Sequence, residues 1–122
     1  MSTIGAAQSD TLLSNINEMK PKFAKIAAVN SGDNVVVAAV TNKKIRVIAL
    51  HFVVAGVVTV IWKSGSTAIT GDENFAQNSG MHLAEVRYGH FETAAGEALN
   101  INLSGSVTVG GAITYVEVPT DR

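Results

Sequence analysis

Apolar residues from residue 22 onward either alternate with polar residues or form short runs, and both patterns are typical of β-strands. The clearest alternation sets Leu99, Ile101 and Leu103 against asparagine and serine, which predicts a strand with one buried face. The apolar run of residues 35–40 is too short for a helix and is rich in β-branched residues. The predicted strands cover residues 22–29, 35–40, 44–54, 57–64, 67–70, 90–93, 99–103 and 107–118, separated by turns rich in Gly, Asn and Ser.

Two glycine-containing regions depart from this pattern. Residues 71–89 contain three glycines and two asparagines, which predicts a long loop with one short strand near residues 83–86. Gly110 and Gly111 interrupt the last predicted strand. Adjacent glycines inside a strand indicate a bulge or a close approach of another backbone segment.

A different pattern precedes the predicted strands. Ser9 or Asp10 can cap a helix and Pro21 ends it. Between them, four apolar residues recur at helical spacing: Leu12, Leu13, Ile16 and Met19. A helix of about three turns is marginal alone, so we expect it to pack on this domain or on another chain. The chain therefore divides into an N-terminal arm, residues 1–21, and a β-sandwich domain, residues 22–122.

The order of the elements limits the fold class. Eight or nine strands joined by short turns, with no helix predicted after residue 20, exclude alternating βαβ architecture. We expect an all-β, jelly-roll-like β-sandwich of about eight strands with a short N-terminal helix or arm. An immunoglobulin-like sandwich is the alternative.

The apolar stretch of residues 47–62 could be mistaken for a membrane span. A spanning helix needs about 20 apolar residues, and this stretch is shorter and contains His51 and Thr59. Two buried strands joined by a turn at residues 55–56 fit it better. Residues 1–8 show no signal-peptide pattern, so we expect the protein to be made and kept in the cytoplasm of its cell.

Composition removes several classes of function. Only 16% of the 122 residues are charged, against about 25% in ordinary domains, and the net charge is −1. Such a surface has no general electrostatic attraction for nucleic acid or anionic membranes. Without cysteine, the chain forms no disulfide, thiol nucleophile or thiolate metal site. We expect no cofactor.

Candidate chemistry in the sequence is sparse. The histidines His51, His82 and His90 show no metal-ligand spacing, so we expect no metal site, and His51 should be a half-buried packing residue. No nucleophile-elbow motif is present, and the carboxylates are scattered. An enzyme built on His82, Glu85 and His90 is the weakest hypothesis. The chain is predicted not to be an enzyme.

Trp62 has two interpretations. A tryptophan in a valine-rich strand is typical of a core residue. Alternatively, Trp62 and Tyr88 line a glycan-binding groove beside the loop of residues 71–89.

Several segments together resemble small virion structural proteins of tailed bacteriophages, most closely their capsid decoration (cement) proteins. The segments that carry the resemblance are KIRV at residues 44–47, VIWKSGS at 60–66, FETAAGEALN at 91–100, VTVGG at 107–111 and TYVEV at 114–118. The resemblance covers roughly residues 30–118, contains no catalytic motif and leaves the arm unmatched.

What the resemblance implies is a non-enzymatic jelly-roll protein on the outer surface of an expanded phage head. It would act as a homotrimer and clamp neighbouring major capsid subunits against the pressure of the packaged DNA. Its partners would be the major capsid protein and copies of itself, with neither nucleic acid nor membrane. Leu12, Leu13, Ile16 and Met19 of the arm are the candidate contacts. The alternative is a tail- or fibre-associated module that binds host glycans through Trp62 and Tyr88.

Overall fold

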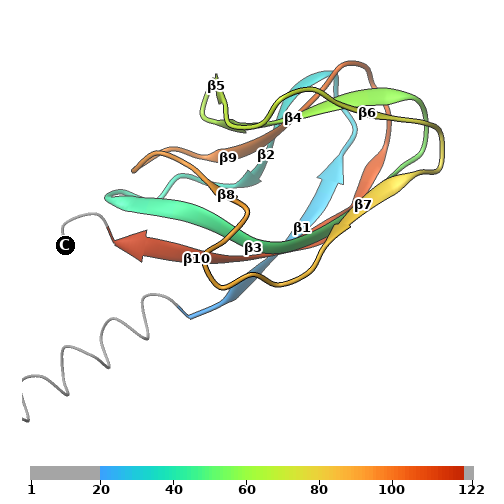
Figure 1. Ribbon diagram of the computed structural model, residues 1–122. Coiled ribbons are helices and arrows are strands. Elements are labelled where there is room, and N and C mark those ends of the chain that lie inside the picture. Colours follow the sequence, from blue (N-terminus) through green and yellow to red (C-terminus); the bar gives the residue numbers. More distant parts are fainter. Residues whose placement is uncertain (1–19, 120–122) are drawn as a thin grey trace, which may run out of the picture.

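The computed structural model describes residues 20–119 and shows two antiparallel sheets packed face to face as a β-sandwich (Figure 1). The predicted all-β fold is therefore confirmed, whereas the predicted N-terminal helix lies outside the described residues. The strands are β1 (Lys22–Ala28), β2 (Gly32–Val37), β3 (Lys43–Val54), β4 (Val58–Ser64), β5 (Thr67–Ala68), β6 (Glu73–Phe75), β7 (Gly80–Leu83), β8 (Phe91–Glu92), β9 (Leu99–Leu103) and β10 (Val109–Pro119).

Strands from the beginning of the chain pair with strands from its end, in two sheets. We call the sheet with the order β1-β10-β3-β7 sheet A, and β8 also pairs with β3. Sheet B has the order β2-β9-β4-β5, and β6 also pairs with β4. The first strands thus pair with the last ones, β1 with β10 and β2 with β9, while successive strands β1 to β4 change sheet each time. This nested winding is that of a jelly roll.

The core lies between the sheets and follows the alternation of the strands. Leu99, Ile101 and Leu103 on β9 are at most 1% exposed, as the sequence pattern predicts. Trp62 on β4 is fully buried against Phe52 of β3 and Phe91 of β8, with ring centroids 6.3 and 5.5 Å apart. Long-range aromatic contacts therefore fix the two sheets on each other.

Sheet A contains an irregularity that the sequence does not reveal. In the pairing of β3 with β10, Ala49 lies opposite Thr114 and Val47 opposite Tyr115, which leaves Ile48 as an extra residue. Such a bulge changes which residues face the core. Ile45 and Val47 face inward before it, and Leu50 and Phe52 face inward after it.

The glycine pair Gly110–Gly111 marks a close backbone approach rather than the bulge itself. A Cβ atom added at Gly111 would lie 2.0 Å from the carbonyl oxygen of His51. The register shift falls instead between Thr114 and Tyr115. Of the two predicted explanations, the close backbone approach is therefore confirmed at Gly111, and the bulge lies elsewhere in the strand.

The region of residues 71–89 is more ordered than predicted. It contains two short strands, β6 and β7, and not the single strand expected near residues 83–86. β6 pairs with β4, and β7 pairs with β3 through Leu50 opposite Leu83. Within residues 20–119, no helix is long and apolar enough to span a membrane.

Candidate interaction surface

The outer face of sheet A consists mainly of small, uncharged residues. The register aligns its outward positions in three rows across the strands: Lys25, Ala112, His51 and His82; Ala27, Gly110, Val53 and Gly80; and Phe23, Thr114 and Ala49. Lys25 is the only charged residue in these rows. Phe23 and Val53 protrude, with 78% and 56% of their surfaces exposed. The face is therefore a low-charge surface from which two apolar side chains project.

Two shallow hollows lie on either side of the row that contains Lys25, Ala112, His51 and His82. One has a volume of about 250 Å³ and lies between Phe23, Ala49, Ala112 and Glu85. The other, of about 330 Å³, lies beside Val53 and Gly80. His51 and His82 line both hollows. Side chains of a docked molecule thus have space on either side of the two histidines.

Beyond these rows, the segment between β7 and β8 is hydrogen-bonded along β3. The amide of Val86 donates to the carbonyl of Ile48 at 2.9 Å, and the amide of His90 donates to that of Val47 at 2.8 Å. Ile48 is only 4% exposed, although it does not belong to the core cluster between the sheets. Gly89 adopts a φ of 84°, and a Cβ there would lie 2.5 Å from Cγ of Arg46. The segment is therefore held closely against β3.

A charged cluster joins β8 to β3. Nε of Arg46 lies 2.8 Å from one carboxylate oxygen of Glu92, and Nζ of Lys44 lies 3.4 Å from the other. Burial alone would raise the pKa of Glu92, but the hydrogen bonds and charges of Arg46 and Lys44 outweigh it and lower the pKa. The cluster thus stabilises the short pairing of β8 with β3 in the ionised state.

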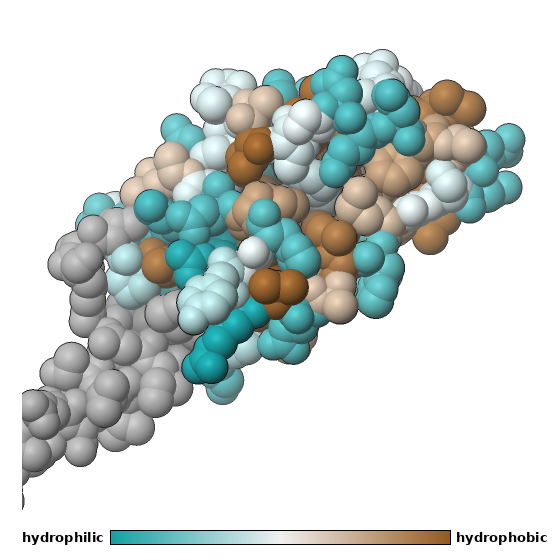
Figure 2. Space-filling model, in the orientation of Figure 1, coloured by the Kyte–Doolittle hydropathy of each residue, from teal (hydrophilic) through white to brown (hydrophobic). Residues whose placement is uncertain are grey.

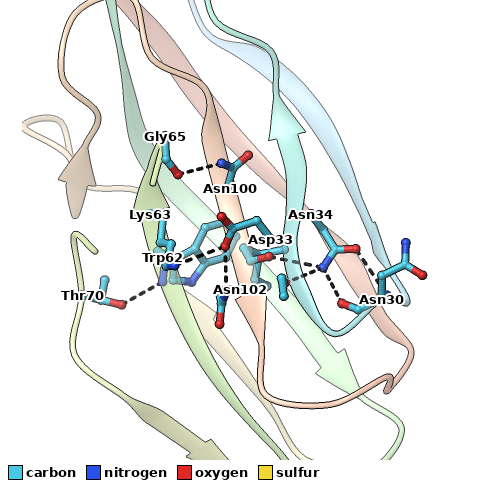
Figure 3. A network of polar contacts seen from close by, with 11 residues as sticks. Asn30, Asp33, Asn34, Trp62, Lys63, Gly65, Thr70, Asn100 and Asn102 are labelled. Atoms are coloured by element: carbon cyan, nitrogen blue, oxygen red, sulfur yellow. Dashed lines mark hydrogen bonds and ion pairs between the residues drawn. The ribbon is translucent and has the colours of Figure 1, made fainter. Parts of the chain in front are cut away.

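The outer face of sheet B is largely polar, and several of its side chains already make hydrogen bonds or an ion pair within the protein. Asn102 donates to the Asp33 carboxylate at 2.7 Å, and Nζ of Lys63 lies 3.4 Å from the same oxygen (Figure 3). Asn100 donates to the carbonyl of Gly65 at 2.8 Å. Polar side chains that already have partners within the protein gain little from a docked protein. Sheet A is therefore the better candidate for a contact surface.

The space-filling view is consistent with a surface that lacks one dominant apolar patch. On the side seen in Figure 2, apolar side chains lie singly or in small groups among polar and weakly polar ones. Exposed large apolar residues are spread over several elements: Phe23, Val29, Val35, Val53, Val57, Val86 and Tyr88. Any contact must therefore rely on the shape of the face as well as on its hydrophobicity.

The predicted glycan groove is not formed by the described residues. Trp62 is fully buried between the sheets, and Tyr88 is 84% exposed on the segment between β7 and β8. The hypothesis of an exposed Trp62 is wrong, because the strand alternation directs this side chain into the core. The interpretation of Trp62 as a core residue is confirmed.

The other candidate residues are placed as follows. His82 and Glu85 line the same hollow, but Nε2 of His90 lies 2.8 Å from the carbonyl oxygen of Ala84, outside that set. His90 does not line this hollow, and its ring is engaged with the backbone of Ala84. Leu12, Leu13, Ile16 and Met19 of the arm lie outside the described residues.

The sequence interpretation missed the pairing of two histidines. His51 is exposed, not half-buried, and lies directly opposite His82. Adjacent residues of a strand point to opposite faces, so a buried Phe52 places His51 outward. The sequence analysis predicts no strand at His82, and therefore not the pairing of the two histidines. Among residues 20–119, no group of three or more His, Asp or Glu side chains forms a metal site.

Comparisons with known proteins add no relative. No family model matches the chain, and no curated protein or solved structure is similar enough to count as a match.

Proposed function

We propose that this protein is a non-enzymatic structural protein of a phage virion that binds the outer surface of the expanded capsid. The outer face of sheet A is the observation that carries the proposal. A weakly charged sheet face whose rows consist mainly of Ala, Gly, Thr and Val suits close contact with another folded protein. The resemblance of residues 30–118 to capsid decoration proteins supports the same assignment.

The proposed partner is the major capsid protein, and the proposed role is to clamp neighbouring capsid subunits. A compact sandwich suits this role because it presents a broad, stiff surface. We expect the protein to act as a homotrimer, with the arm of residues 1–21 reaching a neighbouring copy or the capsid. The protein would be made in the host cytoplasm and reside on the virion.

Co-sedimentation tests the proposal directly. Purified protein is mixed with expanded phage heads that lack it, and unexpanded heads serve as the control. We expect saturable binding to expanded heads alone, at a fixed ratio to capsid subunits. Absence of binding to both kinds of head would overturn the proposal, and glycan binding by a tail-associated module would then be tested.

Two matched variants identify the face that makes the contact. Ala112→Glu introduces a negative charge at the centre of the sheet A face, directly opposite Lys25 on β1. Val35→Glu introduces the same charge on the outer face of sheet B, where Val35 is 66% exposed. We expect head binding to fall at least tenfold with Ala112→Glu and to stay unchanged with Val35→Glu. Equal affinities of the two variants would contradict the use of the sheet A face.

A further inference from the structure

Two of the three histidines of the chain lie side by side on the outer face of sheet A. His51 on β3 and His82 on β7 are direct partners in the antiparallel register, and both are exposed. Directly opposite residues in such a pair have Cβ atoms about 4.5–5.5 Å apart. Two imidazoles at this separation can reach the same point above the sheet.

The core holds both histidines in this arrangement. On β3, the residues on either side of His51 are Leu50 and Phe52, which are 2% and 1% exposed and belong to the core. On β7, Met81 and Leu83 flank His82 and pack against the same core. Because neighbouring residues of a strand point to opposite faces, His51 and His82 must both point outward. Their backbone positions are therefore fixed before any ligand binds.

The two imidazoles have space and are not engaged elsewhere. Within residues 20–119, neither ring makes a hydrogen bond or an ion pair, whereas Nε2 of His90 lies 2.8 Å from the carbonyl oxygen of Ala84. On the outer face, His51 lies opposite Ala112 and is flanked along β3 by Ala49 and Val53. Both rings border open hollows, which leaves space beside them for a ligand.

We propose that His51 and His82 form a two-imidazole chelate for one divalent late transition-metal ion of the Zn²⁺ or Cu²⁺ class. Neutral imidazole binds these ions at about 2.0–2.1 Å and is a poor ligand for Mg²⁺ and Ca²⁺, which prefer oxygen. No third protein ligand completes the set within the described residues. The other coordination positions are open to water or to a donor group of a molecule docked on this face.

This site does not depend on the proposed virion function. Metal binding is a property of the isolated protein, whereas capsid attachment is measured with phage heads. Either property can therefore fail without the other.

Calorimetric titration of the full chain with ZnCl₂ tests the site. We expect saturable binding of one ion per chain and none with MgCl₂ or CaCl₂. His51→Ala and His82→Ala should each weaken Zn²⁺ binding at least tenfold, because a chelate loses one of its two donors. His90→Ala is the matched control, because it removes the third histidine of the chain and should leave the titration unchanged.

Cu²⁺ electron paramagnetic resonance gives a second measurement that a change in stability would not imitate. The bound ion should show superhyperfine coupling to two imidazole nitrogens in the unmodified protein and to one in either single variant. Zn²⁺ binding that persists in the His51→Ala/His82→Ala double variant would overturn the proposal. So would a Cu²⁺ spectrum without two coupled nitrogens, because the donors would then lie elsewhere.

Discussion

Gly111 has no space for a side chain, and its neighbour Gly110 provides a control. A Cβ at Gly111 would overlap the carbonyl oxygen of His51, which is fixed in the centre of sheet A, whereas a Cβ at Gly110 would meet no atom within 4 Å. We expect Gly111→Ala to lower the free energy of unfolding by at least about 2 kcal/mol. Gly110→Ala should leave it unchanged or raise it by up to about 1 kcal/mol, because glycine weakens a strand. Urea unfolding of both variants checks this, and similar values would contradict the pairing of β10 with β3.

Neighbouring residues of β9 differ sharply in their surroundings. Ile101 is fully buried, so Ile101→Asp places an unpaired charge in the core and should cost several kcal/mol, about 3 or more. Asn102 lies on the outer face, where Asn102→Ala removes one hydrogen bond to Asp33 and should cost about 1 kcal/mol. Thermal unfolding compares the two variants. Equal losses would refute the register of β9.

The sequence predicts inward and outward positions well only where polar residues mark the outer face. On β9, asparagines alternate with leucine and isoleucine, and each predicted core residue is buried. On β3, the outward Val53 is as apolar as the inward Val54, and the extra residue Ile48 shifts the alternation. The outer face of β3 beside His51 consists of Ala49 and Val53, so no polar neighbour marks it in the sequence.

At the scale of elements, the pairing of β8 with β3 should depend on pH. The lowered pKa of Glu92 means that its ionised form is favoured in the folded protein. Its contribution to stability is therefore present above its ordinary pKa of 4.5 and is lost as the pH falls through the lower folded value. Glu92→Gln should destabilise the protein at neutral pH, and the difference from the unmodified protein should shrink in acid. Unfolding midpoints across this range measure it.

Glu73 on β6 should behave in the opposite way. Burial raises the pKa of Glu73, so its ionised form is disfavoured in the folded protein. This cost is absent below the ordinary pKa of 4.5 and grows as the pH rises through the folded value. Glu73→Gln should therefore stabilise the protein at neutral pH and have little effect in acid. A loss of stability at neutral pH would contradict the assignment.

The sequence predicts most strands but not all of their bounds: β2 runs over Gly32–Val37 and not residues 35–40, and β10 begins at Val109 and not at residue 107. The bounds of β1, β3, β4 and β9 agree with the predicted ranges to within one residue, because each carries its own apolar pattern. β6 and β7 have three and four residues and contain Glu73, Asn74, Gly80 and His82, which are not typical of strands. These strands form because β4 and β3 offer free edges, and no local pattern reveals that.

For the whole molecule, the arm is predicted to serve assembly and not folding. β1 begins at Lys22, opposite Tyr115 near the end of β10. The described sandwich therefore already contains its first strand, β1, paired with its last strand, β10. Deletion of residues 1–20 should change the melting temperature by no more than about 2 °C. A loss of about 1 kcal/mol would lower it by several degrees at this size, so a change this small means that the arm contributes little to stability. The same deletion should weaken self-association and attachment to expanded heads.

Analytical ultracentrifugation and co-sedimentation check this prediction. The full chain should sediment with the mass of three chains and the deletion variant with a lower mass. Unchanged affinity for heads after the deletion would remove the role assigned to Leu12, Leu13, Ile16 and Met19.

The nested winding also determines when the protein can fold during its synthesis. β10 is an inner strand of sheet A and the last strand of the described sandwich. Its partners β1 and β3 come much earlier in the chain, since β3 ends at Val54 and β10 begins at Val109. A growing chain on the ribosome therefore holds β1 and β3 without the strand that joins them, and their apolar faces stay uncovered until β10 emerges. The sandwich can therefore close only after β10 has been made, and chains that still lack β10 are the species most exposed to aggregation and to chaperones.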